Sequence, residues 1–196
     1  MNDTPTVHSP CPACGRPPLP GAVICARCAR WLNIAEPLFD EGPSALDSVW
    51  SSAPDEGVAR DLVAALKFRR LRSVASLMAD QIERLAPKPL LLGSIVPVPA
   101  ARRRAPFRRL EPAREIATAL AERLDLPLHP WLERRPAGRL GQTPGQCAFR
   151  ATAAAPRRVV LVDDVMDTGE TLAACARALR AAGASRMVAL TFARRV

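Results

Sequence analysis

The chain of 196 residues has no tyrosine, only 4% aromatic residues, and only two histidines, His8 and His129. Proteins that bind single-stranded nucleic acid usually stack the bases on aromatic side chains, so a stacking platform of that kind is not evident. Neither Cys147 nor Cys175 has a histidine near it in sequence. A catalytic triad built on cysteine or serine is therefore poorly supported.

Long apolar runs are also missing. No stretch approaches the roughly 18 unbroken apolar residues that a membrane helix needs. The first eight residues have neither the basic start nor the apolar run of a secretory signal. We therefore expect no membrane insertion and a cytoplasmic location, where thiols remain reduced. Hydrophobic residues make up 48% of the chain, enough for the core of one domain with a small accessory module.

Lysine is scarce, since Lys67 and Lys88 are the only two, and the net charge of +9 comes from arginine. Attraction to polyanions such as nucleic acid or diphosphates is one interpretation of this charge. Composition bias is the other, because alanine and arginine are both abundant, as in a GC-rich genome. The total charge alone does not separate the two.

Three stretches of different composition divide the chain. Residues 1–32 are rich in cysteine, proline and glycine and lack an apolar period long enough for a core. Residues 33–55 have prolines and acidic residues typical of a connector. Residues 56–196 have apolar residues at regular spacing and predict one larger domain.

Within the larger domain, apolar periodicity predicts helices alternating with strands. We expect helices over 57–68, 73–85, 112–124 and 171–182, strands over 90–96, 159–162 and 187–192, and a loop over 134–158. Strands that alternate with helices indicate an α/β fold with a mainly parallel sheet flanked by helices.

Four cysteines near the start form two Cys-x-x-Cys pairs, Cys11 with Cys14 and Cys25 with Cys28. Two such pairs complete a tetrahedral Zn²⁺ site, whereas disulfides are disfavoured in the cytoplasm. Four thiolates leave no open position for substrate, so the predicted zinc is structural and residues 1–32 form a zinc-ribbon module. We expect its core to be separate, so that metal loss unfolds this module alone.

Residues 159–171 predict a binding site for a phosphorylated ribose. The apolar strand over 159–162 ends at Asp163 and Asp164, and open α/β sheets bind ligands at the carboxyl ends of their strands. Adjacent carboxylates offer acceptors for the vicinal hydroxyls of a ribose. Gly169 permits close backbone approach, and the N–H groups at the following helix start can hold a phosphate.

The ordered series over 159–171 resembles the phosphoribosyl diphosphate signature of the type I phosphoribosyltransferases. Together with the cysteine pairs, it resembles the ComF family, zinc-ribbon and phosphoribosyltransferase-like proteins linked to competence and DNA uptake. Residues 66–69, Leu-Lys-Phe-Arg, are similar to the family's Leu-Lys-Tyr-Arg-type segment, and residues 95–99, Ile-Val-Pro-Val-Pro, to its Val-Pro-Val-Pro strand end.

The resemblance implies a type I phosphoribosyltransferase-like fold and a set of site residues. Mg²⁺ would accompany the diphosphate, and Asp167 would be the catalytic carboxylate near a base. The expected ribose and phosphate ligands are Asp163, Asp164, Asp167, Thr168, Gly169, Glu170 and Thr171. Residues expected to contact diphosphate or nucleic acid are Lys67, Arg102, Arg103, Arg104, Arg108 and Arg109.

Three departures from the family pattern keep three functions open. One is Asp167, which occupies a place where many family members have a small or hydroxyl residue. The family's Arg-Gly-Phe-Asn-Gln-like stretch is replaced here by Arg109-Leu110-Glu111-Pro112, and the segment over 142–159 is short for a flap that covers substrate. A ComF-type accessory protein of DNA uptake would bind phosphoribosyl diphosphate or a nucleotide, with single-stranded DNA and other uptake proteins as further partners. The alternatives are an active phosphoribosyltransferase, which Asp167 favours, and a non-catalytic ligand sensor.

Overall fold

The computed structural model describes residues 9–43, 45–100, 110–135 and 148–196. Its main sheet has the strand order β1-β2-β7-β6-β3, and every neighbouring pair is parallel except β1 with β2. The strands span Leu38–Glu41 (β1), Ser48–Pro54 (β2), Ser94–Pro97 (β3), Arg158–Met166 (β6) and Arg186–Arg194 (β7). The expected α/β fold with a mainly parallel sheet is confirmed.

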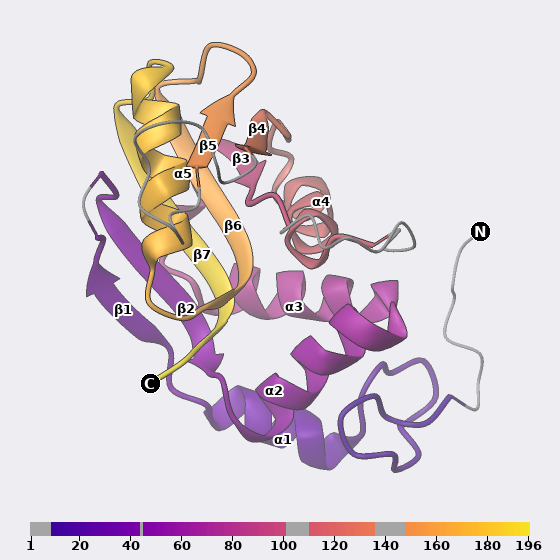
Figure 1. Ribbon diagram of the computed structural model, residues 1–196. Helices are drawn as coiled ribbons and strands as arrows, with labels where there is room; N and C mark the ends of the chain where they lie inside the picture. Colours follow the sequence, from indigo (N-terminus) through magenta and orange to yellow (C-terminus); the bar gives the residue numbers. More distant parts are fainter. Residues whose placement is uncertain (1–8, 44, 101–109, 136–147) are drawn as a thin grey trace.

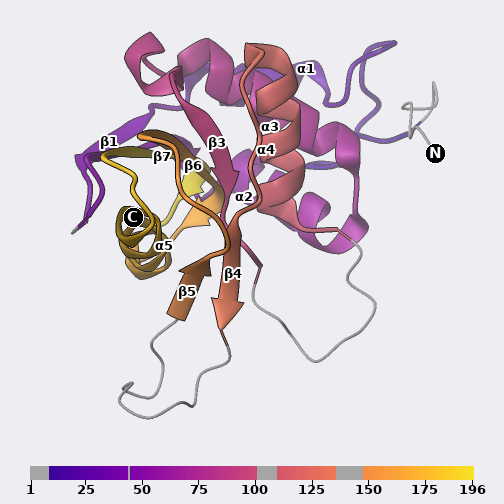
Figure 2. The same cartoon turned by 90° about the horizontal axis from the view of Figure 1, so that it is seen from above.

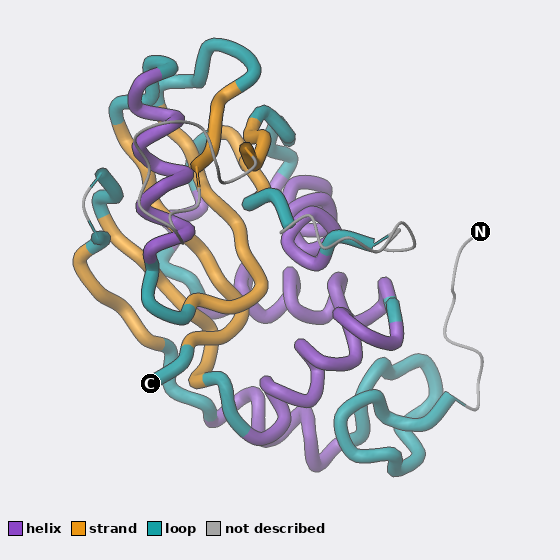
Figure 3. Tube along the Cα trace, in the orientation of Figure 1, coloured by secondary structure: helices purple, strands orange, loops and turns teal. Residues whose placement is uncertain are grey.

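Helices cover both faces of this sheet (Figures 1 and 3). Helices α2, α3 and α4 lie on one face and α5 on the other. The helices span Ala26–Ile34 (α1), Gly57–Ala64 (α2), Arg72–Leu85 (α3), Pro112–Leu124 (α4) and Glu170–Ala181 (α5). Strand β6 serves both faces, because Val160 and Val162 pack into the core under α3 and α4 while Val159 and Leu161 pack under α5.

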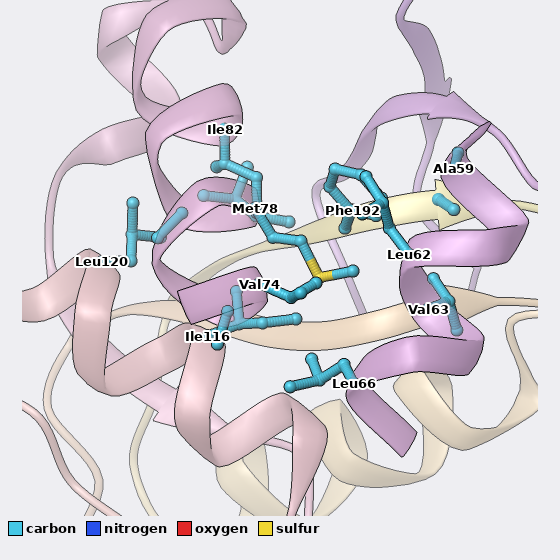
Figure 4. Close-up of a cluster of buried hydrophobic side chains, with 14 of the residues drawn as sticks. Ala59, Leu62, Val63, Leu66, Val74, Met78, Ile82, Ile116, Leu120 and Phe192 are labelled. Carbon is cyan, nitrogen blue, oxygen red and sulfur yellow. The ribbon is translucent and has the colours of Figure 1, made fainter. Parts of the chain in front are cut away.

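The larger core lies between the sheet and helices α2, α3 and α4 (Figure 4). Its members recur at helical spacing, as the sequence predicts, and are buried on the inner faces of the helices. The largest fully buried side chains of this core include Leu62, Leu66, Met78, Ile82, Ile116, Leu120 and Phe192. Phe192 comes from β7 and brings the sheet into contact with the helices.

The N-terminal module shares this core, which corrects the expectation of separate cores. Cys11, Cys25, Cys28 and Leu32 belong to the same buried cluster as the helices of the larger domain. The buried Gln81 side chain of α3 also donates a 2.9 Å hydrogen bond to the Leu32 carbonyl. Residues 1–32 are too few to bury their own apolar side chains, so α1 packs on the neighbouring helices.

Residues 33–55, predicted to be a connector, contain two strands of the main sheet. Strand β2 pairs along its length with β7, and β1 pairs with β2 at the edge. The prediction of a connector is therefore wrong for these residues. The strand was not recognised because serines interrupt the apolar pattern of β2. Ser51 is fully buried, and its hydroxyl lies 2.7 Å from that of Thr191 on β7, so its polar group is satisfied.

Several local differences from the predicted elements also appear. The strand expected over 159–162 is β6 and runs on to Met166, so Asp163 and Asp164 lie within the strand rather than after its end. The helix expected over 57–68 is α2 followed by a π-helical turn, η1, at Ala65–Arg69. The strand expected over 90–96 is a 3-10 turn, η2, at Lys88–Leu91, followed by β3. The loop expected over 134–158 overlaps an antiparallel pair, β4 (Leu132–Arg135) with β5 (Ala148–Ala151), which lie side by side in Figure 2.

The described part of the chain contains no helix with the length and apolar character required to cross a lipid bilayer.

Candidate functional site

Strands β3 and β6 run parallel and bring two chain segments to one edge of the sheet. Pro97 at the end of β3 pairs with Val162, and the N–H of Val98 donates a 2.9 Å hydrogen bond to the Val162 carbonyl. Asp163 and Asp164 follow Val162 directly. The two carboxylates therefore lie beside the segment that leaves β3, as the topology of a parallel sheet requires.

A pocket of about 240 Å³ opens at this edge. Its walls come from η1, the chain after β3, the start of α4, and strands β4 and β6 with the first turn of α5. The lining residues are Lys67, Val98, Pro99, Ala100, Pro112, Ala113, Arg134, Asp163, Asp164 and Thr171. The structure thus brings four of the predicted site residues together.

Lys67 and Asp164 form an ion pair on the wall of the pocket. The Lys67 Nζ atom lies 2.8 Å from Oδ2 of Asp164, whose residue is 7% exposed. Oδ1 of the same carboxylate accepts a 2.9 Å hydrogen bond from the Val165 N–H. The Lys67 ammonium and the Val165 N–H thus compensate the charge of this buried carboxylate.

Asp163 is the less well compensated carboxylate of the pair. Burial raises the pKa of Asp163 well above its ordinary value, and the adjacent charge of Asp164 raises it further. The Asp164 N–H, which donates a 2.9 Å hydrogen bond to Oδ1 of Asp163, and the Lys67 ammonium act in the opposite direction. A like-charged pair in a pocket is a recurring feature of functional sites.

The loop between β6 and α5 places a helix start beside these carboxylates. Gly169 is the N-cap of α5 with φ +78°, a left-handed conformation that favours glycine. A Cβ atom there would also lie 3.3 Å from Cγ of Pro43. Thr171 in the first turn lines the pocket. The first N–H groups of a helix lack internal partners and attract anions.

Other residues predicted from this loop lie outside the pocket lining. The Thr168 hydroxyl accepts a long 3.4 Å hydrogen bond from the Glu170 N–H, and both residues are exposed. The Asp167 side chain is 62% exposed, and its Oδ2 lies 2.9 Å from Nη1 of Arg195. Arg195 also lies 3.5 Å from a carboxylate oxygen of Asp55. Asp167 is therefore paired with Arg195 at the surface rather than in the pocket.

Arg134 is a pocket residue that the sequence analysis missed. It lies on β4, with its guanidinium 5.5 Å from the centre of the Phe149 ring on β5. Arg134 lies in a segment predicted to be a loop, and no motif in that segment indicates a pocket residue. A second pocket, about 480 Å³, shares Val98, Pro99, Ala100 and Arg134 with the first and is also lined by Arg114 and Arg150.

The predicted arginine loop lies outside the described residues. Arg102, Arg103, Arg104, Arg108 and Arg109 all fall within residues 101–109. Their proposed contacts with diphosphate or nucleic acid therefore stay predictions.

The four N-terminal cysteines converge as a metal site requires. The sulfur atoms of Cys11, Cys14, Cys25 and Cys28 all lie within 4.8 Å of one another, with Cys14 and Cys25 3.5 Å apart. Zn–S bonds of about 2.3 Å in a tetrahedron fit such spacing. A hydrogen bond from the Cys28 backbone lowers the pKa of Cys25 to about 7, which favours the thiolate that binds metal, whereas burial raises the pKa of Cys28 above its ordinary value. The cluster can hold a structural zinc ion.

Comparison with known protein families agrees with this geometry. The family model described as "Phosphoribosyl transferase domain" matches residues 111–195, from the N-cap of α4 to just beyond β7. A search of curated proteins finds no match. The matched segment covers less than half of the chain but contains both carboxylates, the following loop and α5. The chain therefore carries a phosphoribosyltransferase-type domain, preceded by a four-cysteine cluster consistent with a zinc ribbon.

Proposed function

We propose that the chain binds phosphoribosyl diphosphate, together with Mg²⁺, in the pocket at the carboxyl edge of the sheet. The observation that carries this proposal is the convergence of Lys67, Asp163, Asp164 and Thr171 on one pocket. The two carboxylates accept hydrogen bonds from the ribose hydroxyls. The first turn of α5, with the Thr171 hydroxyl, holds the 5-phosphate.

The diphosphate end of the ligand faces the arginine-lined side of the site. The second pocket neighbours the first, because Val98, Pro99 and Ala100 line both. Arg134 lines both, and a guanidinium suits the oxygens of a phosphate. Mg²⁺ binds mainly through the ligand, since adjacent phosphates attract this hard cation.

Calorimetric titration with phosphoribosyl diphosphate and Mg²⁺ tests this proposal. Asp164→Asn should weaken binding about tenfold or more, because hydrogen bonds to a charged group are worth about 1.5–3 kcal/mol. Asp61→Asn is the matched control, since Asp61 is exposed on α2 and outside the pocket lining. Removal of Mg²⁺ by a chelator should abolish the signal. Unchanged affinity in Asp164→Asn would place the ligand elsewhere.

Transfer of the phosphoribosyl group to a base is the second candidate, and Asp167 favours it. Its carboxylate lies in the loop before α5. The 2.9 Å contact with Arg195 must break before this carboxylate can reach a base. Pyrophosphate release, measured with each nucleobase in turn, distinguishes turnover from binding alone. Binding without release under all conditions identifies a ligand sensor.

A ComF-type role in DNA uptake is the biological setting we propose for this site. Two segments that carry the ComF resemblance both reach the pocket, through Lys67 from residues 66–69 and through Val98 and Pro99 from residues 95–99. The association of these motifs with the four-cysteine cluster supports the same family. In this setting the arginines of residues 101–109 contact single-stranded DNA.

Binding of single-stranded DNA should fall with salt if those arginines serve it. The expected slope of log affinity against log salt is about −0.7 for each neutralised phosphate. Replacing Arg103, Arg104 and Arg108 by alanine should flatten this slope and weaken binding to all sequences alike, because phosphate contacts do not read bases. Filter binding at several salt concentrations measures it. A DNA signal that is absent or insensitive to salt removes the DNA role and leaves an enzyme or a sensor.

A further inference from the structure

The π-helical turn η1 contacts two distant parts of the molecule. On one side the Lys67 Nζ atom lies 2.8 Å from Asp164 in the pocket. On the other, Nη1 of Arg69 donates a 3.2 Å hydrogen bond to the carbonyl oxygen of Pro12. Residues two apart on a helix do not face the same side, so one short turn can reach both partners.

The Pro12 carbonyl belongs to the first cysteine pair, between Cys11 and Cys14. The turn around it is closed by hydrogen bonds from the Cys11 N–H to the Arg16 carbonyl and from the Gly15 N–H to the Cys11 carbonyl, both 2.8 Å. The convergence of the four sulfur atoms fixes the ends of this turn. The acceptor of Arg69 is therefore held in place by the four-cysteine cluster.

The conformation of η1 requires support from outside the helix. π-Helical turns are rare and occur mostly at functional sites. Arg70, which ends the turn, has φ +58° and ψ +36°, a left-handed conformation that costs a non-glycine residue free energy. Ala65 and Leu66 are buried in the core, which holds the start of the turn. Near the other end of the turn, the hydrogen bond from Arg69 to the Pro12 carbonyl stabilises its conformation.

We propose that Arg69 is a positioning residue through which the four-cysteine cluster holds Lys67 against Asp164 in the ligand pocket. The cluster fixes the Pro12 carbonyl, this carbonyl fixes Arg69, and the turn then presents Lys67 to the carboxylate. None of the described cysteines lines the pocket, yet metal loss lowers ligand affinity. The predicted effect on the affinity for phosphoribosyl diphosphate rests on the proposed function. The coupling of the four-cysteine cluster to η1 does not.

A double-mutant cycle measured with phosphoribosyl diphosphate and Mg²⁺ tests the route. Arg69→Ala should weaken binding at least about threefold while the zinc content stays at one per chain. In a Lys67→Ala background the same change should have no further effect, because Arg69 acts through Lys67. Arg69→Lys keeps a donor for the Pro12 carbonyl and should recover most of the affinity. Equal losses in the two backgrounds, or no loss in either, would overturn the proposal.

Arg72→Ala is the matched control for the loss of a positive charge. Arg72 lies on α3, close to η1 in sequence, and its Nε atom is 3.4 Å from a Glu115 oxygen rather than near the cysteine pairs. It should leave the affinity unchanged. A loss as large as that of Arg69→Ala would mean that charge alone matters, which contradicts the proposal.

Hydrogen exchange provides a readout that needs no ligand. In the wild type, chelation of the metal should speed amide exchange at residues 65–70 and leave α5 unchanged. In Arg69→Ala these amides should already exchange faster, with little further effect of chelation. Absence of phosphoribosyl diphosphate binding in the wild type would refute the proposed function, whereas exchange at residues 65–70 that ignores both chelation and Arg69→Ala would refute the coupling.

Discussion

Replacing Cys11 and Cys25 together by serine should abolish zinc binding and lower the thermal stability of the whole chain. A structural Zn²⁺ site contributes about 10–16 kcal/mol to the folding of small modules, and serine is a poor ligand for this metal. Because the cysteines and Leu32 pack in one cluster with Leu62 and Leu66, the damage reaches the larger core. Most of that free energy folds the small module itself. We expect about 2–4 kcal/mol to be lost from the larger core, which lowers its Tm by about 5–15 °C, since each 1 kcal/mol shifts the Tm by about 2–4 °C at this size.

Elemental analysis of reduced protein measures the metal, and calorimetry measures the transition. Cys175→Ser is the control for loss of a buried thiol, because Cys175 lies on α5 in the core of the opposite face. It should keep one zinc per chain. Zinc retained in the double variant would contradict the four-cysteine site. A lost metal with an unchanged main transition would instead show that the module unfolds independently of the larger domain.

The features that sequence predicted well are those fixed by neighbouring residues. The existence of β6 and the start of α5 beside Gly169 follow from local pattern and spacing, although β6 runs on to Met166 rather than ending at Val162. The cysteine pairs can also be recognised from local sequence, because the geometry of a metal site restricts the spacing between its ligands. Helices α3 and α4 were predicted within about one residue of their ends, since amphipathic periodicity is a local signal.

The features that sequence missed depend on partners far along the chain. Strand β2 carries Ser51 and Ser52 at fully buried positions, and only β7 and the Thr191 hydroxyl make Ser51 acceptable there. Arg134 reaches the pocket because β4 lies near the end of β3, which no local pattern indicates. The turn η1 departs from a regular helix in a segment whose Arg69 contacts a carbonyl 57 residues away.

Asp163→Asn should weaken binding of phosphoribosyl diphosphate and, at neutral pH, stabilise the free protein. The ribose hydroxyls lose an anionic acceptor, which corresponds to a loss of about tenfold to 150-fold in affinity. Stability moves the other way because the folded protein tolerates the Asp163 charge poorly beside Asp164. Functional sites commonly trade stability for function in this manner, since the ligand uses the charge that folding disfavours.

The sign of the pH dependence follows from the raised pKa of Asp163. A carboxyl whose pKa is higher in the folded than in the unfolded state binds more protons when folded, so it lowers the free energy of unfolding as pH rises. The free energy of unfolding starts to fall near pH 3.8, the ordinary pKa of an aspartate, and stops falling above the raised pKa of Asp163. The amide that replaces this carboxyl in the variant does not titrate, so the stability advantage of the variant should grow across that window and then stay constant.

Thermal unfolding and ligand titration across the same pH range measure both effects. Wild-type affinity should increase relative to the variant as pH rises through the raised pKa of Asp163, because the ionised carboxylate is the better acceptor. The phosphates of the ligand also titrate near pH 6, but they do so equally with both proteins, so the ratio of affinities isolates Asp163. Asp61→Asn should change neither stability nor affinity. A variant that is less stable than the wild type at neutral pH would mean that Lys67 and the Asp164 N–H compensate the Asp163 charge fully, and the carboxylate pair would then be a structural element of β6.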